Sequence, residues 1–163
     1  MFFTLTVKSE VSAAHYLSGE IFSENCKSRH GHNYQIEVLL SSPILDEVGM
    51  VIDAGFIKSL LKSEFDHKDL TEVMHFKGGL LRLNGPINAT AENFAQIIAM
   101  LLQFKIDKAV NDTRKLEDQL IVESVMVEES RGIAATFVTQ YREERDELRR
   151  EERERELISV KGL

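Results

Sequence analysis

The sequence predicts an α+β domain in which two helices cover one face of a four-stranded antiparallel sheet. Three observations support this fold class. Two stretches of alternating apolar and polar residues come first, two stretches with helical periodicity follow, and two strand-like stretches come last. Strands and helices grouped in this way are typical of antiparallel sheets with helices on one side. The expected order of elements is therefore ββααββ.

The first two strands are predicted from period-two alternation. Phe3, Leu5 and Val7 alternate with polar residues, which is the pattern of a half-buried strand. The alternation changes phase over residues 10–15. A second alternation runs from Tyr34 to Leu40 and ends at a Ser-Ser-Pro sequence that favours a turn.

The remaining elements follow from helical spacing and from apolar runs. Phe56–Phe65 carries apolar residues at helical spacing, and a second helix is expected after Asn88, with Asn88 or Thr90 as its cap. Residues 120–127 and 133–138 predict the last two strands, with a turn between them. The segment from residue 71 to 87 contains glycines and a proline, and we expect a long irregular loop there.

The 163 residues are expected to form one domain, residues 1–140, followed by a charged tail, residues 141–163. Between Arg142 and Glu156 every residue except Leu148 is charged. A stretch without an apolar face cannot pack on a core, so a solvated helix is predicted, with a partner-binding helix as the alternative.

Composition excludes several classes of protein. A net charge of −7 argues against broad binding to nucleic acids or anionic membranes. No apolar run reaches the roughly 20 residues that span a bilayer, and the N-terminus does not resemble a secretion signal. A single cysteine cannot form an internal disulfide, so a reducing, cytoplasmic location is expected.

The stretch CKSRHGHNY, residues 26–34, contains the only cysteine and two of the five histidines. His30 and His32 would point to the same side of a strand, because side chains two residues apart share a face. His15 would join them if the first two strands pair antiparallel. Three imidazoles suit a catalytic zinc ion with one open position. The alternative is three unrelated histidines that cap turns or form hydrogen bonds in the core.

Cys26 has two alternative roles. It could be a fourth zinc ligand in a closed structural site, or an unligated thiolate that acts as a base or nucleophile. The spacing leaves both open. The neighbouring Lys27 and Arg29 would favour the thiolate and would also suit an anionic substrate.

Two further places could contribute chemistry. Asp66 could hold His67 in one tautomer as an acid–base pair, provided that the segment bends, since adjacent residues point in different directions. Glu129 could accept two parallel N–H bonds from a guanidine-like edge such as that of a pterin, or it could be solvated and inert. His75 is expected to be a surface residue.

Six short stretches, taken in order, resemble the 6-pyruvoyl-tetrahydropterin synthase family across most of the predicted domain. They are SAAH (12–15), CKSRHGHNY (26–34), GMVIDAGFIK (49–58), FDHKDL (65–70), NATAEN (88–93) and VMVEES (125–130). The short spacing from Cys26 to His30 is similar to the bacterial branch, the queuosine-pathway 6-carboxy-5,6,7,8-tetrahydropterin synthases. The chain departs from the family pattern at Ala54, Ala89 and Ser130.

The resemblance implies the tunnelling fold, in which subunits join edge to edge into a barrel as trimers or hexamers. It implies a zinc ion held by His15, His30 and His32. It also implies that Cys26 is the catalytic base, that Asp66 and His67 form an acid–base pair supplied by a neighbouring subunit, and that Glu129 anchors the pterin ring.

The implied reaction converts 7,8-dihydroneopterin triphosphate to 6-carboxy-5,6,7,8-tetrahydropterin, with release of acetaldehyde and triphosphate. The rearrangement is internal to the substrate, and the chain has no dinucleotide-binding fingerprint. Two alternatives stay open. One is a 6-pyruvoyl-tetrahydropterin synthase that releases triphosphate only, and the other is a non-catalytic module that binds zinc or a pterin.

Overall fold

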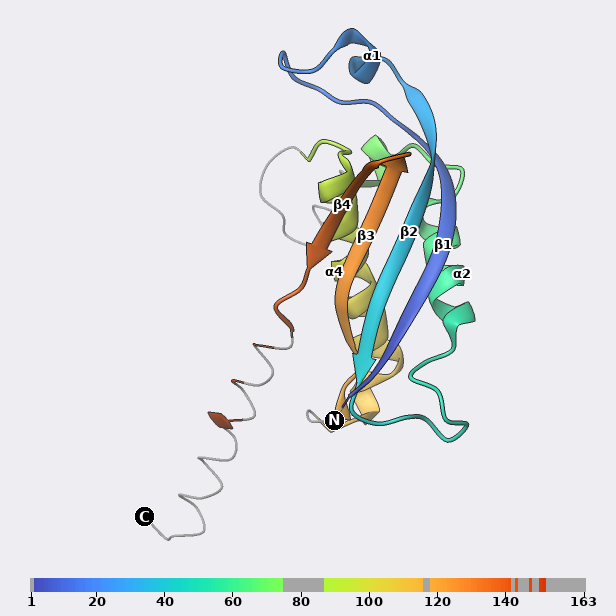
Figure 1. Ribbon diagram of the computed structural model, residues 1–163, viewed down its shortest axis with the longest axis vertical. Helices are drawn as coiled ribbons and strands as arrows, with labels where there is room; N and C mark the ends of the chain where they lie inside the picture. Colours follow the sequence, from blue (N-terminus) through green and yellow to red (C-terminus); the bar gives the residue numbers. More distant parts are fainter. Residues whose placement is uncertain are drawn as a thin grey trace, which may run out of the picture.

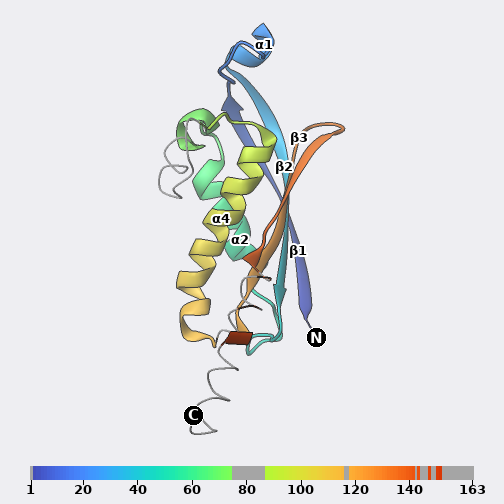
Figure 2. The ribbon, with the colours of Figure 1, turned by 90° about the vertical axis from the view of Figure 1, so that its left-hand side faces the viewer.

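The structure, a computed structural model, describes residues 2–74, 87–115 and 118–141, together with 143, 147, 150 and 151. Four antiparallel strands form one sheet in the order β1-β2-β3-β4 (Figure 1). The strands are β1 (Phe3–His15), β2 (His30–Ser42), β3 (Ile121–Ser130) and β4 (Ile133–Val138). Helices α2 (Ala54–Phe65) and α4 (Ala91–Ala109) cover one face of this sheet (Figure 2). The predicted fold class is confirmed.

Strand β1 is longer and more regular than predicted. Val7, Val11, Ala13 and His15 are all buried and lie at odd positions, so a single face of the strand turns towards the helices throughout. The predicted change of phase over residues 10–15 is wrong. It arose because a serine, a small alanine and a histidine occupy positions on the buried face, where larger apolar residues make a pattern easier to see.

The pairing of β1 with β2 places the histidines at one end of the sheet. His15 lies opposite His30, and Ala13 lies opposite His32. His32 is followed on the same face by Tyr34, which is 1% exposed and belongs to the hydrophobic core. Because side chains alternate along a strand, His30, His32 and Tyr34 lie in a row on one face of β2, from the histidine cluster to the hydrophobic core.

Each of the two long helices begins at a side-chain cap. Asp53 accepts a hydrogen bond from the Gly55 amide at the start of α2, and Thr90 accepts one from the Asn93 amide at the start of α4. Thr90 is therefore the cap, rather than Asn88. The buried face of α2 consists of Ile57, Leu61 and Phe65, and full burial of each such side chain stabilises the fold by about 1.5–3 kcal/mol.

Several short elements were not predicted. A single-turn helix α1 (Glu24–Lys27) lies before β2, and a 3-10 turn η1 (Asn111–Thr113) follows α4. Residues 70–74 are helical, which corrects the predicted loop at its start. The reason is local, because the Asp69 carboxylate caps this turn by accepting from the Thr71 amide at 2.9 Å.

Residues 75–86, with His75, lie outside the described residues, as does most of the tail. In that tail, residues 141, 143, 147, 150 and 151 are helical. The predicted turn between the last two strands is confirmed, and Gly132 adopts a φ of 85° there. None of the helices in the described part of the chain has the length and apolar character needed to cross a bilayer.

Candidate functional site

Three imidazoles converge where β1 ends and β2 begins. The Nε2 atoms of His15 and His30 are 3.0 Å apart. One ligand nitrogen from each of His15, His30 and His32 lies within 4.8 Å of the others, and this is the one such group of three or more in the described part of the chain. His15 is buried, whereas the other two are half-buried. Three nitrogens at this spacing can surround one metal ion.

Backbone carbonyls fix the orientation of two of the rings. Nδ1 of His15 lies 2.6 Å from the Ala89 carbonyl oxygen, and Nδ1 of His30 lies 2.7 Å from that of Ser28. A carbonyl can only accept, so both Nδ1 atoms carry hydrogen and donate. This leaves Nε2 as the ligand atom in each ring, which is the arrangement found around protein-bound metals.

The third ring has an unsatisfied nitrogen. Nε2 of His32 is buried and makes no hydrogen bond with any described residue. Buried polar atoms almost always have a partner, so an exception in a cluster of this kind points to a ligand. Together with the two oriented rings, this atom makes the donor set a fit for zinc.

The Glu129 carboxylate, on β3, faces the same cluster. Its Oε1 atom is 3.0 Å from Nε2 of His15 and 3.6 Å from Nε2 of His32. The hydrogen bond from His15 is the main reason that the pKa of Glu129 is held below its ordinary value. His15 cannot donate from Nε2 to Glu129 and ligate a metal through the same atom. Metal binding here therefore requires loss of that proton.

The electrostatics of the cluster differ from ring to ring. Burial favours neutral His15, but its bonds with Glu129 and the Ala89 carbonyl, together with nearby negative charge, outweigh burial and raise its pKa. Burial, aided by the other two rings, lowers the pKa of His32 in spite of Glu129. Burial also raises the pKa of the Tyr34 hydroxyl, and the charge of Glu129 adds to this effect. The pKa values of His15 and His32 are thus shifted in opposite directions within one cluster.

Asp66 and His67 lie just beyond α2, on the outer edge of β1. Asp66 accepts from the Ser12 amide at 2.9 Å and from Nζ of Lys62 at 3.1 Å. The hydrogen bond from the Ser12 amide is the main reason that the pKa of Asp66 lies below its ordinary value; burial opposes it, and Lys62 adds a smaller lowering effect. His67 has a φ of 54°, so the segment bends as the acid–base pairing requires.

The Asp66–His67 pair is loose in this structure. Nε2 of His67 is 3.8 Å from the Asp66 carboxylate, and the His67 side chain is 83% exposed. None of the hydrogen bonds or ion pairs between described residues connects either side chain to the three histidines. The His67 imidazole is thus exposed to solvent and has no hydrogen bond or ion pair with its own histidine cluster among the described residues.

Cys26 lies in α1, within the loop that projects beyond the sheet (Figures 1 and 2). The thiol is half-buried and accepts from the Ser23 hydroxyl at 3.3 Å. Its sulfur is not among the ligand atoms grouped with the three histidines. In this arrangement the cysteine does not complete a closed four-ligand site.

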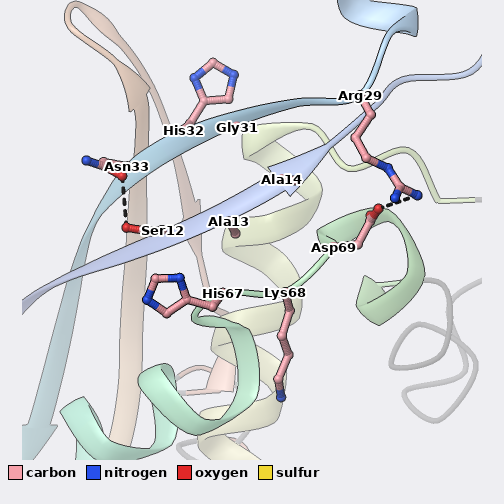
Figure 3. A pocket seen from close by; sticks show the side chains of 10 residues that line it. All are labelled: Ser12, Ala13, Ala14, Arg29, Gly31, His32, Asn33, His67, Lys68 and Asp69. Atoms are coloured by element: carbon pink, nitrogen blue, oxygen red, sulfur yellow. Dashed lines mark hydrogen bonds and ion pairs between the residues drawn. The ribbon is translucent and has the colours of Figure 1, made fainter.

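A cavity of about 760 Å³ lies beside the cluster, along the outer edge of β1. Figure 3 shows His32 and His67 on either side of the β1 ribbon, with the backbone of residues 12–14 between them. Lys68 turns away from this space and donates to the Ser63 carbonyl. Arg29 spans the rim to reach Asp69. The cavity thus joins an edge of the histidine cluster to the proposed acid–base segment.

Sequence reasoning did not identify the groups that orient these side chains. The carbonyls of Ala89 and Ser28 have no signature in a sequence, because any residue supplies a carbonyl. The same holds for the Ser12 amide that binds Asp66. The sequence predicts that Arg29 favours the Cys26 thiolate and suits an anionic substrate, whereas in the structure it forms an ion pair of 2.8 Å with Asp69.

Sequence comparisons agree on one family. The model of the 6-pyruvoyl tetrahydropterin synthase family matches residues 4–140. A 6-carboxy-5,6,7,8-tetrahydropterin synthase from Rickettsia bellii is 32% identical over 102 residues, which is 55% of this chain and 72% of the relative. The same-named Helicobacter pylori J99 protein is 30% identical over 121 residues, 67% of this chain and 60% of the relative.

Other relatives match over shorter stretches. A 6-carboxy-5,6,7,8-tetrahydropterin synthase from Rickettsia typhi is matched over 38% of this chain, and the match spans about half of the relative, 46%. The 6-pyruvoyl tetrahydrobiopterin synthase of Dictyostelium discoideum is 32% identical over 87 residues, 45% of this chain and 64% of the relative. Both reaction types therefore occur among the relatives.

Solved structures show the same fold. The 6-pyruvoyl tetrahydropterin synthase of Caenorhabditis elegans superposes with a TM-score of 0.58 at 23% identity, covering 85% of this chain and 96% of that one. The Plasmodium vivax enzyme gives a TM-score of 0.57 at 20% identity, covering 84% and 97%. These are proteins of the predicted tunnelling fold. The chain belongs to the 6-pyruvoyl tetrahydropterin synthase family.

Proposed function

We propose that this protein is a zinc-dependent lyase of queuosine biosynthesis that acts in the cytoplasm as a trimer or hexamer. It would convert 7,8-dihydroneopterin triphosphate and water to 6-carboxy-5,6,7,8-tetrahydropterin, acetaldehyde and triphosphate. The observation that supports this most strongly is the convergence of three imidazole nitrogens. Backbone carbonyls orient two of the rings, and the nitrogen of the third has no hydrogen bond with a described residue.

His15, His30 and His32 would hold the zinc ion. With three protein ligands, the ion would keep an open position and supply Lewis-acid polarisation to a hydroxyl of the pterin side chain. The separation of Cys26 from the histidine group supports an open site over a closed structural one.

Cys26 and His67 would move the protons. The Cys26 thiolate would remove a proton from a carbon of the substrate side chain, and Nε2 of His67 would exchange protons with a side-chain oxygen as triphosphate leaves. Asp66 would hold His67 and stabilise its protonated form. Since His67 is exposed and is not bonded to its own histidine cluster, a neighbouring subunit is the proposed recipient of this pair.

Glu129 would bind the pterin ring. In the structure its carboxylate accepts from Nε2 of His15. Metal ligation at that nitrogen removes the donated hydrogen, so the carboxylate would become available for two parallel N–H groups of a pterin. The same residue would thus balance the charge of the cluster before substrate binds and orient the substrate afterwards.

The main alternative is release of 6-pyruvoyl-tetrahydropterin and triphosphate. The similarity to the Dictyostelium discoideum protein favours it. The choice between the two reactions depends on whether the carbon–carbon bond of the side chain is cleaved. The bacterial relatives named as 6-carboxy-5,6,7,8-tetrahydropterin synthases favour cleavage.

The first experiment is mass spectrometry of the products after the zinc-loaded protein is incubated with 7,8-dihydroneopterin triphosphate. A carboxy-tetrahydropterin with acetaldehyde is expected. Detection of a pyruvoyl-tetrahydropterin would agree with the family but would identify the alternative reaction. Unchanged substrate would contradict both reactions.

Cys26→Ala tests the third reading, a non-catalytic zinc or pterin module. We expect this variant to bind zinc with unchanged stoichiometry and to lose turnover by at least about 100-fold, the lower end of what a proton-transfer group contributes. Zinc content is measured by competition with a chelator and turnover by product formation. Loss of zinc from the variant would instead make Cys26 a ligand.

A further inference from the structure

The loop that carries Cys26 is joined to the rest of the molecule at its two ends. At the first end, Ser18 exchanges hydrogen bonds of 2.8–3.0 Å with the Asn88 side chain. At the second end, Arg29 reaches Asp69. Between these points, the bonds of residues 19–28 to described residues stay within the loop or lead to Leu17 and His30. The position of the thiol therefore depends on the two ends and on the bond that the Leu17 amide donates to the Cys26 carbonyl at 2.8 Å.

The second end lies much nearer to Cys26 in the chain. Nη2 of Arg29 is 2.8 Å from Oδ2 of Asp69, and this carboxylate is only 13% exposed. The guanidinium also lies over the Tyr16 ring, 5.9 Å from its centroid. Lys27 makes no comparable link, because its ammonium group pairs with Glu24 within α1 itself. Arg29 is thus the side chain that fixes the end of the turn.

Asp69 belongs to a segment that is itself fixed to β1. The His67 amide donates to the Ser12 carbonyl at 2.7 Å, and the Ala14 amide donates to the Lys68 carbonyl at 3.0 Å. The other oxygen of Asp69 caps the helical turn that follows, through the Thr71 amide. An arginine bound to Asp69 is therefore held at a set distance from the segment that carries Asp66 and His67.

Arg29 is a poor candidate for a direct anion contact in this arrangement. Asp69 neutralises it at 2.8 Å, and Glu72 adds a second carboxylate at 3.7 Å. A triphosphate would have to displace an ion pair whose carboxylate is largely buried. The observations favour a structural link over a substrate contact.

We propose that Arg29 and Asp69 form a positioning pair, which holds the Cys26 turn against the segment carrying Asp66 and His67. The proposal rests on the function proposed above, because it concerns the placement of Cys26 in that reaction. Neither Arg29 nor Asp69 touches substrate in this scheme. Each acts through the cysteine.

The first test measures the rate at which iodoacetamide alkylates Cys26, the only thiol of the chain, in the zinc-loaded protein. If charge alone mattered, Arg29→Gln would slow alkylation by disfavouring the thiolate, and Asp69→Asn would accelerate it. If the pair positions the turn, either substitution removes the restraint on the turn and makes the Cys26 thiol more accessible. Both variants should then be alkylated about three to five times faster, as expected for loss of a partly exposed ion pair. Asparagine at position 69 can still cap the helical turn.

Glu72→Gln is the matched control. It neutralises the Glu72 carboxylate, which is 74% exposed and lies farther from Arg29 than Asp69 does. The alkylation rate should change by less than about twofold. Arg29→Lys should give a rate between those of the wild type and Arg29→Gln, because lysine keeps the positive charge but lacks the planar guanidinium group. The double variant R29Q/D69N should be no faster than either single variant, since the two substitutions remove one interaction.

The second test measures steady-state kinetics of product formation together with zinc affinity. Arg29→Gln and Asp69→Asn should each lower kcat by about tenfold with little change in KM, since small displacements of a reacting group are costly. Zinc affinity should fall by no more than about tenfold, because the released turn contributes only the Ser28 carbonyl that orients His30. A rise in KM at unchanged kcat would overturn the proposal and make Arg29 a substrate ligand.

Opposite changes in alkylation rate for the two variants would also overturn the proposal, as would additive effects in the double variant. If the wild-type protein turned over no pterin, the proposed function would fail. The alkylation rates would still decide whether this pair positions Cys26.

Discussion

The two ends of the sheet each bury polar side chains, but in opposite ways. At one end, His15, His30 and His32 meet with an Nε2 atom that has no hydrogen-bond partner among the described residues. At the other end, Gln103 and Asn111 are 3% and 4% exposed. Both the amide nitrogen and the amide oxygen of each are bonded, to Asp107 and to the backbone of residues 120 and 122.

This difference separates a structural cluster from a candidate metal site. Gln103 and Asn111 connect the end of α4 to the start of β3, and the side-chain amides of both are hydrogen-bonded. The three histidines, by contrast, place ligand nitrogens where they could hold a metal ion. Satisfied polar groups contribute to the stability of the fold, whereas a convergent unsatisfied group indicates a ligand.

The largest effect that would sharpen this comparison is expected for His32→Ala. Zinc affinity should fall by more than about 100-fold, because loss of a ligand costs more than the 10–100-fold typical of outer-shell partners. The metal-free protein should lose less than about 1 kcal/mol of stability, because the ring makes no hydrogen bond there. Chelator competition and urea unfolding measure the two quantities. A strongly destabilised metal-free variant would mean that His32 is a core residue.

Asn111→Ala should show the reverse behaviour. It removes the acceptor for the Leu120 amide and a donor to the Leu120 carbonyl, both of them bonds that are buried. We expect a loss of about 2 kcal/mol in the free energy of unfolding and unchanged zinc affinity. The exposed neighbour Asp112→Ala is the control, with little expected change in either quantity. A drop in zinc affinity for Asn111→Ala would show that the two ends are coupled.

Thr90→Ala should modestly lower both the free energy of unfolding and the zinc affinity. Loss of the cap of α4 should cost about 1 kcal/mol of stability. The cap follows Ala89, whose carbonyl orients His15, so zinc affinity should fall by severalfold. Thr90→Ser keeps the hydroxyl and is expected to behave as wild type. Unchanged zinc affinity in Thr90→Ala would show that the orientation of His15 does not depend on this turn.

Asp66→Asn should have the smallest effect on stability, and the size of this effect should depend on pH. The folded-state pKa of Asp66 lies below its ordinary value, chiefly because of the Ser12 amide. The ionised carboxylate therefore stabilises the fold above the unfolded pKa of about 4, and this contribution is lost as the pH falls through the lower folded value. Urea unfolding of both proteins over this pH range should show a difference that shrinks with acid. A constant difference would contradict this account.

Much of the fold could be predicted because strand and helix periods are visible in the sequence. The HxH spacing places His30 and His32 on one face of a strand, and antiparallel pairing brings His15 to them. The end of β1 was less clear, because Ala13 and His15 carry the buried pattern with small or polar side chains. Periodicity identifies a face only where its residues are large and apolar.

The groups that organise the site could not be predicted. The Ala89 carbonyl lies 74 residues from His15 in the chain, and contacts between backbone atoms leave no trace in residue identity. Whether Cys26 is a ligand or a base depends on the path of a loop that has no periodicity. Arg29 and Asp69 illustrate the same point, since a pair of opposite charges in two distant segments is common by chance.

The segment that follows α2 also limits what can pair with β1. It bonds to Ser12, Ala14 and Tyr16, the alternate residues whose backbone groups point away from β2. An added strand can therefore pair with β1 only over the part that precedes Ser12, and it has to end there. If a neighbouring chain extends this sheet, the bend at His67 would fix the residue of β1 at which the added strand ends. The end of that strand would then lie close to the acid–base pair.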